Sequence, residues 1–232
     1  MAVGVPGTKH KQSTSTDQND ESEFLAPTRA EADTYSANYY AQKHHNPDPE
    51  EEAGAVQVKG FDVRVRANRT PYVDMGIWGP FHRKVLRAIK FRTFIPAGDG
   101  TYIQKEVPGP SNFDQYTVMW KVFVVACLMT RHVADFALEI YYKNLAKLMR
   151  LWPEAWHLVY EADDNMRAEH IERIRRKVVT DIARGEAPPD DWDAAHPWTA
   201  CFVLAANSKD YWDEHVKERA VAWHAHGGHG AP

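Results

Sequence analysis

Apolar residues recur at helical spacing through the second half of the chain. Between Phe113 and Leu128, intervals of three and four residues give a broad apolar stripe, and Ser111 or Asn112 stands where it can cap the first turn. A second stripe runs from about residue 134 to residue 152. Because the connection between the stripes is short, the pattern predicts two helices packed antiparallel as a hairpin.

The run Leu151-Trp152-Pro153-Glu154-Ala155-Trp156 marks the next boundary. Proline is tolerated in the first turn of a helix, so the run predicts a corner leading into a third helix over 153–183, which stops at Gly185. Later apolar stripes predict shorter helices over 198–206 and 210–224. The predicted class is therefore mostly α, a bundle of about five helices.

The chain before Pro108 has a different pattern. Alternating apolar residues over 56–65 predict a short extended segment, and the stretches 90–95 and 101–107 predict a β-hairpin around Asp99-Gly100. Residues 1–55 offer few core residues and carry ten acidic side chains against four basic ones. Such a composition predicts disorder.

These patterns predict four parts. Their ranges are a disordered acidic and polar tail over 1–55, a small basic, aromatic-rich, β-containing lobe over 56–107, a helical domain over 108–226 and a flexible tail over 227–232. Two cysteines, both in apolar contexts, indicate a reducing compartment rather than a disulfide framework. Neither a signal peptide nor a spanning segment is recognisable, so we expect an intracellular protein, cytoplasmic or nuclear, without a membrane partner.

Basic residues concentrate between Lys59 and Lys105, where ten Lys or Arg face three Asp and aromatic residues are interleaved. Arg and Lys side chains bind phosphate groups, and unpaired bases stack on aromatic rings. This composition is therefore typical of a nucleic-acid-binding surface. The alternative explanation of this segment is structural, with the basic side chains exposed to solvent and the aromatic side chains packed in a core. The candidate nucleic-acid-binding residues are Arg64, Arg66, Arg69, Arg83, Lys84, Arg87, Lys90 and Arg92. Arg173, Arg175, Arg176 and Lys177 form a weaker second patch.

The predicted third helix carries charge on its apolar face. Asp163 and Arg167 fall within the apolar stripe, four residues apart. Since buried charges are normally paired, they are predicted to form a structural ion pair. The functional alternative is a catalytic carboxylate in a hydrolase that uses Asp163, Glu169 and His170. The sequence supplies no catalytic partner at a recognisable spacing, so we expect no catalytic residue.

Histidine is dense near the end of the chain, at His224, His226 and His229. These imidazoles form a weak candidate for adventitious metal binding. A helix end that frays into a glycine-rich linker, with histidine near the negative end of the helix, is the favoured explanation. We therefore expect no cofactor and no functional metal.

Several short strings also form a pattern by their order and spacing. They are Pro71-Tyr72-Val73-Asp74, Arg87-Ala88-Ile89-Lys90-Phe91-Arg92, Pro108-Gly109-Pro110 with Phe113 and Trp120, the Leu151–Trp156 run, Ala162-Asp163-Asp164-Asn165-Met166-Arg167, and Ala195-His196-Pro197-Trp198. Together they resemble a module repeated in polyproteins of mobile retroelements from single-celled algae of the dinoflagellate type. The resemblance covers residues 56–232 and implies a gag-like, capsid-type domain.

In such polyproteins the module precedes a zinc knuckle, a protease and a polymerase, and this chain carries the motifs of none of the three. The resemblance therefore implies a non-enzymatic, self-associating domain that packages RNA. Its expected partners are further copies of itself and RNA or DNA, with no small-molecule substrate. A host nucleic-acid-binding module derived from such an element is the alternative.

Overall fold

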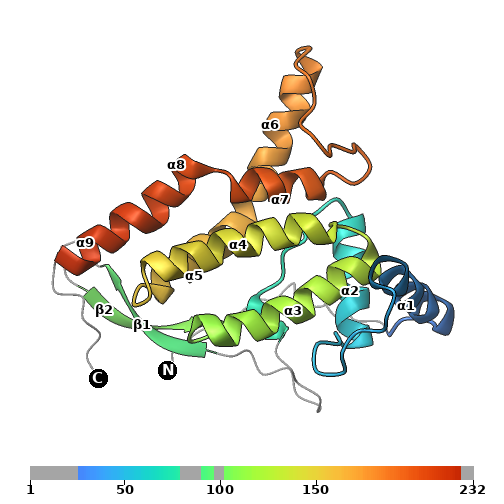
Figure 1. Ribbon diagram of the computed structural model, residues 1–232, viewed down its shortest axis with the longest axis horizontal. Helices are drawn as coiled ribbons and strands as arrows, with labels where there is room; N and C mark the ends of the chain where they lie inside the picture. Colours follow the sequence, from blue (N-terminus) through green and yellow to red (C-terminus); the bar gives the residue numbers. More distant parts are fainter. Residues whose placement is uncertain (1–25, 79–89, 97–101, 226–232) are drawn as a thin grey trace, which may run out of the picture.

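The fold is mostly helical, which confirms the predicted class. The computed structural model describes residues 26–78, 90–96 and 102–225, and in its two strands Glu106 is the only described side chain. Within these ranges there are seven continuous helices instead of about five, because two helices precede the predicted ones (Figure 1).

Helices α3 (Phe113–Thr130) and α4 (Asp135–Leu151) form the centre of the molecule. The side chain of Asn112 accepts a hydrogen bond from the backbone N–H of Gln115 at 2.8 Å and so caps α3, as predicted. Arg131 ends α3 in the left-handed conformation, with φ of 58°. The connection to α4 follows at once, so the two helices pack as the predicted hairpin.

The third predicted helix is continuous from Trp156 to Ala183 but widens in the middle. It consists of α5 (Trp156–Asn165), the π-helical turn η4 (Met166–His170) and α6 (Ile171–Ala183). The sequence predicts Pro153 in the first turn of this helix. In the structure Pro153 lies in the turn that precedes α5. A π turn is rare, and it re-aims the side chains that it carries.

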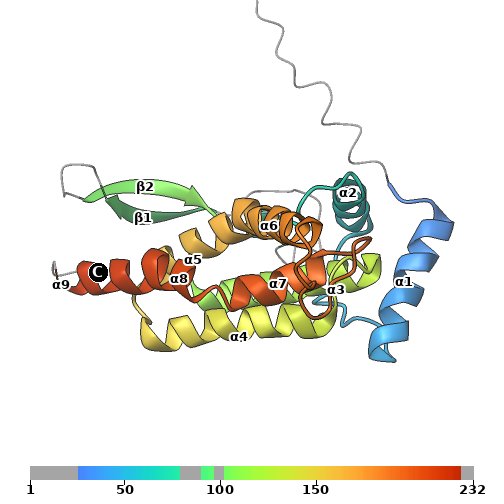
Figure 2. The same cartoon turned by 90° about the horizontal axis from the view of Figure 1, so that it is seen from above.

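The last part of the chain folds back along α4 and α5. Helix α7 (Trp198–Ala206) packs against α4 and α6. A final helix is built from α8 (Lys209–Trp212), a second π turn η5 (Asp213–Glu218) and α9 (Arg219–Ala225), and its η5 segment contacts α5. Figure 2 shows α7 beside α4 and α6, with α5 and α6 end to end as parts of one helix, and in Figure 1 the far end of α6 projects from the body.

Helix α1 (Arg29–Lys43) contradicts the prediction of disorder through residue 55. Thr28 and Glu31 form a capping box, in which each side chain bonds the other residue's backbone N–H. Tyr35 and Tyr39 are buried against the core, where α1 contacts α3. Composition alone misses this helix because it is held by only two buried tyrosines together with hydrogen bonds from Asn38 and Gln42 to backbone carbonyls of α3.

Helix α2 (Ala55–Arg66) likewise replaces the extended segment predicted over 56–65. Val58, Phe61 and Val65 are buried, at helical spacing, whereas Val56 and Val63 are exposed. The valines that suggested alternation therefore lie on two different faces of a helix. Helix α2 packs against α3, and its rings join the central core.

One hydrophobic core unites α2 with the helical domain. Phe61 contacts both Trp78 and Phe123 with ring centroids 5.8 Å apart, and Trp78 follows the short 3-10 turn η3 (Met75–Ile77). Trp120 of α3 stacks on Tyr141 of α4 at 5.6 Å. Residues 58–78 thus belong to the same core as the helices that follow, rather than to a separate lobe.

Strands β1 (Lys90–Pro96) and β2 (Tyr102–Pro108) pair antiparallel, with Phe94 opposite Gln104. They lie where the sequence predicts a hairpin, and its turn falls outside the described residues. After β2 the chain enters the core at Gly109, whose φ is 124°. A Cβ at this position would overlap the ring of Tyr160, so the close approach requires glycine.

Candidate functional site

The Asp163–Arg167 ion pair is present and completely buried, as predicted. Arg167 donates from Nε and Nη2 to Oδ2 of Asp163 at 3.0 and 2.8 Å, and the two side chains are 0% and 1% exposed. Arg167 also donates to the backbone carbonyl of Val73 at 3.2 Å. The π turn η4 contains Arg167, so the pair lies where the long helix widens.

Tyrosines complete the polar network around the pair. Tyr141 of α4 donates to Oδ1 of Asp163 at 2.9 Å, and Tyr72 donates to Asp164 at 3.0 Å while its ring lies 5.4 Å from the Arg167 guanidinium carbon. Burial, together with the negative charge of Asp163, raises the pKa of Tyr141 well above its ordinary value. The network ties α4, α5 and the segment before η3 into one arrangement.

The residues of the hydrolase alternative are not gathered around one cavity in the described structure. Asp163 is enclosed in the network, whereas Glu169 lies at the surface and accepts from Arg173 at 2.8 Å. His170 packs on the Tyr211 ring with centroids 4.6 Å apart, and burial lowers the pKa of His170. The three side chains therefore have separate sets of neighbours.

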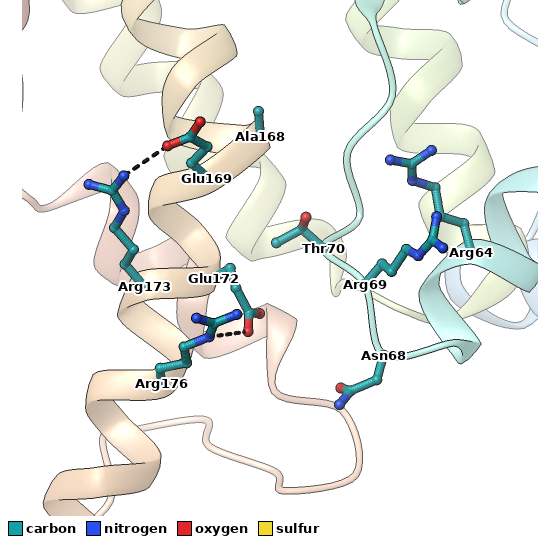
Figure 3. A pocket seen from close by; sticks show the side chains of 9 residues that line it. All are labelled: Arg64, Asn68, Arg69, Thr70, Ala168, Glu169, Glu172, Arg173 and Arg176. Carbon is teal, nitrogen blue, oxygen red and sulfur yellow. Dashed lines mark hydrogen bonds and ion pairs between the residues drawn. The ribbon is translucent and has the colours of Figure 1, made fainter. Parts of the chain in front are cut away.

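Arginines from two distant parts of the sequence meet in a cleft of about 410 Å³, here named the arginine cleft (Figure 3). One wall follows the end of α2 and the other follows η4 and α6. The lining residues are Arg64, Asn68, Arg69, Thr70, Ala168, Glu169, Glu172, Arg173 and Arg176. The structure thus brings together the main basic segment and the second basic patch that the sequence indicated separately.

Charge is unevenly distributed in the arginine cleft. On the α6 wall, Glu172 accepts from Arg175 and Arg176 at 2.8 Å, and Arg173 reaches back along the helix to Glu169. The lining residues of the α2 wall include Arg64 and Arg69 but no carboxylate. The lining as a whole carries four arginines against two glutamates, so the cleft favours an anion.

Arg64 carries a buried donor. Its Nε atom is buried and has no hydrogen-bond acceptor among the described residues. Buried donors normally have a partner in the protein or in bound solvent or ligand. A planar guanidinium matches the oxygens of a phosphate or carboxylate, and Arg64 lines the cleft, so its guanidinium group is a candidate contact for an anionic ligand, although the enclosed Nε itself does not face such a ligand.

The other predicted nucleic-acid-binding residues have different positions. Arg66 turns away from the arginine cleft and donates from Nε to Asp62 at 2.8 Å. Lys90 and Arg92 lie on β1, where side chains are not described. Arg83, Lys84 and Arg87 lie outside the described residues.

A second buried polar network surrounds Asp62, which the sequence did not single out. Its carboxylate is 4% exposed and accepts from Tyr35 of α1, Arg66 of α2 and Nε2 of His132, each at 2.8 Å. Burial alone would raise the pKa of Asp62, but the hydrogen bonds from His132, Arg66 and Tyr35 lower it to about 2. The network links α1 and α2 to the connection between α3 and α4.

Removing the Asp62 charge is expected to destabilise the protein in a pH-dependent way. The lowered folded-state pKa stabilises the fold above about pH 4 by roughly 2 kcal/mol, and this contribution is lost as pH falls through about 2. We expect Asp62→Asn to lower the free energy of unfolding at neutral pH, and its difference from the wild type to shrink between pH 4 and 2. Urea unfolding over a pH series measures both effects.

Asp135→Asn is the control, because Asp135 pairs with Lys43 at a partly exposed position. Exposed ion pairs contribute about 1 kcal/mol or less. An Asp62→Asn effect no larger than that of the control, or one that grows towards low pH, would contradict the stabilising role of this network.

The weak metal candidates are only partly described. His224 packs against Trp152 with ring centroids 5.7 Å apart, and His226 and His229 lie beyond the described residues. In the described part of the chain, no three His, Cys, Asp or Glu side chains are grouped so that they could hold a metal ion. Nor does any helix there have both the length and the apolar composition needed to cross a membrane.

Comparison of the chain with protein-family models, with curated proteins and with solved structures found no match. The arginine cleft is therefore interpreted from its own geometry and charge.

Proposed function

We propose that this protein is a non-enzymatic, helix-rich structural domain that binds RNA through the arginine cleft and associates with copies of itself, in the manner of a gag or capsid domain of a retroelement. The observation that carries the proposal is the meeting of Arg64 and Arg69 with Arg176 around one cleft. Basic residues scattered over a surface are common, but a concave site lined by four arginines from two parts of the chain supports an anionic ligand.

Phosphate is the ligand that fits best. A guanidinium donates two parallel hydrogen bonds to phosphate oxygens, and Thr70 and Asn68 add neutral donors at the same wall. The Glu side chains opposite are already bonded to arginines of their own helix, so they hold those guanidinium groups in place. A chain of phosphates lying along the cleft would contact both walls.

Self-association rests on the resemblance to retroelement polyproteins and on apolar side chains at the surface. Phe136 and Ile140 lie one turn apart on α4 and are 42% and 37% exposed. Exposed apolar positions on one helix face are typical of protein contacts when they are contiguous. These two residues are the first choice for mutation in a test of assembly.

The binding part of the proposal is tested with the double variant Arg64→Gln/Arg69→Gln. Fluorescence anisotropy with a short labelled RNA measures affinity, and circular dichroism verifies the fold. We expect a loss of about tenfold or more, because each charge-assisted hydrogen bond contributes roughly 1.5–3 kcal/mol.

Arg29→Gln/Arg150→Gln is the matched control. It removes the same charge from two exposed arginines that do not line the cleft. Equal losses in the two double variants would mean that RNA responds to net charge alone, and no RNA binding by the wild type would refute the proposal.

Light scattering at high concentration, with and without RNA, tests the self-association part. We expect assembly that weakens when Phe136→Ser/Ile140→Ser replaces the exposed apolar pair. RNA binding by a strict monomer would instead favour the alternative, a host nucleic-acid-binding module.

A further inference from the structure

A second pocket, of about 550 Å³, adjoins the arginine cleft, and Asn68 lines both. This adjoining pocket lies between the end of α2, the end of α3 and the connection that leads into α7. In Figure 3 the Asn68 side chain points away from Arg64 and Arg69. Asn68 therefore lies at the boundary between the arginine cleft and the adjoining pocket.

Two flat, exposed side chains line this pocket. Arg66 is 69% exposed, yet its orientation is fixed because Nε donates to the buried carboxylate of Asp62. His196 is 60% exposed and is held by Asp193 through a 3.1 Å hydrogen bond. Guanidinium and imidazole planes are the kinds of groups on which unpaired bases stack.

The deeper part of the pocket is polar and narrowly exposed. His132 is 11% exposed and bonds Asp62 through Nε2, so its second ring nitrogen remains for another hydrogen-bond partner. Thr130 is 6% exposed, and its hydroxyl donates to the Ala126 carbonyl at 2.8 Å, so its oxygen remains as an acceptor. Asn68 lies at the exposed rim of the pocket and contributes a carboxamide that both donates and accepts. Buried Trp198 adds an apolar wall.

From this arrangement we infer that the adjoining pocket binds an unpaired nucleobase, so that the ligand is a single-stranded nucleic acid. The inference rests on the proposed function, since the phosphates flanking that base would lie in the arginine cleft. Planar groups are exposed in the pocket and hydrogen-bonding groups lie deeper, which suits a base inserted edge first. A duplex cannot use the pocket, because its bases are already paired and stacked.

The test compares a single-stranded RNA with the same strand carrying abasic residues and with a duplex of equal phosphate count. Stacking of one base contributes about fivefold to 150-fold in affinity. We expect the base-bearing strand to bind at least fivefold more tightly than the abasic strand. His196→Ala and Asn68→Gly should remove most of that preference, and glycine suits position 68 because its φ is 62°.

His45→Ala is the control, since it removes an exposed imidazole that lines neither site. Equal affinity for base-bearing and abasic strands, with Arg64→Gln/Arg69→Gln still weakening both, would overturn the base pocket and leave the proposed function intact. A preference that survives both pocket variants would also overturn it. Failure of the wild type to bind any of the three would overturn the proposed function itself.

Discussion

Arg167→Met is expected to lower the free energy of unfolding by about 3–5 kcal/mol, because it leaves the Asp163 carboxylate charged in the interior without its partner. Folded domains are stable by only about 5–15 kcal/mol, so the variant should be close to unfolding at ambient temperature. Urea or thermal unfolding measures the loss. Tyr141 alone cannot compensate, since its single hydroxyl replaces no positive charge.

The same helix supplies the matched control. Arg173 pairs with Glu169 at the same 2.8 Å and the same spacing of four residues, but the two side chains are 68% and 67% exposed. We expect Arg173→Met to cost about 1 kcal/mol or less. The double variant Asp163→Asn/Arg167→Met removes both buried charges and should recover much of the loss. Similar costs for Arg167→Met and Arg173→Met would show that the buried pair is not structurally important.

Gly109→Ala is expected to have the second largest effect. At φ of 124° a side chain is strained, and here the added methyl group would also overlap the Tyr160 ring. Overpacking of a core costs about 1–3 kcal/mol, and the unfavourable backbone adds about 1 kcal/mol. We expect a total loss of roughly 2–4 kcal/mol in the free energy of unfolding, measured by urea denaturation.

Gly185→Ala separates the cost of the strained backbone from the cost of overlap with a neighbouring side chain. Gly185 has φ of 93°, but nothing lies within 4 Å of the position that its Cβ would take. Its substitution should therefore show the backbone cost alone, about 1 kcal/mol. If Gly109→Ala is no more destabilising than Gly185→Ala, the entry of the chain beside Tyr160 is not tightly packed.

The helices that the sequence predicts well are those with a regular apolar stripe. Helix α7 occupies the predicted residues 198–206, and the final helix differs from the predicted 210–224 by one residue at each end. Their boundaries coincide with the ends of the apolar pattern. The sequence did not predict the two π turns, because no local pattern of apolar residues marks such a turn.

The first two helices show why the predictions of disorder over 1–55 and of an extended segment over 56–65 were wrong. Thr28 and Glu31 have the spacing of a capping box, and this local signal could have indicated the start of α1. In α2, Val58, Phe61 and Val65 follow helical spacing, but the exposed valines between them obscured it. Both helices are stabilised mainly by contacts with α3, which no local pattern reveals.

Of the three polar sites, only the Asp163–Arg167 ion pair could be predicted from the sequence. Asp163 and Arg167 are four residues apart on one helix face, so spacing was sufficient. His132 is 70 residues from Asp62, and Arg64 is about a hundred residues from Arg173, so their proximity depends on how α2 packs. The sequence indicated which side chains are basic, whereas the fold determines which of them share a cleft.

The most direct test of the central claim, that the arginine cleft binds nucleic-acid phosphates, is the salt dependence of RNA affinity. Each phosphate contact to a single strand contributes about 0.7 to the slope of log affinity against log salt concentration. We predict that Arg64→Gln/Arg69→Gln makes the slope shallower by about 1.4, while Arg29→Gln/Arg150→Gln leaves it nearly unchanged. An unchanged slope in the cleft variant would contradict the claim.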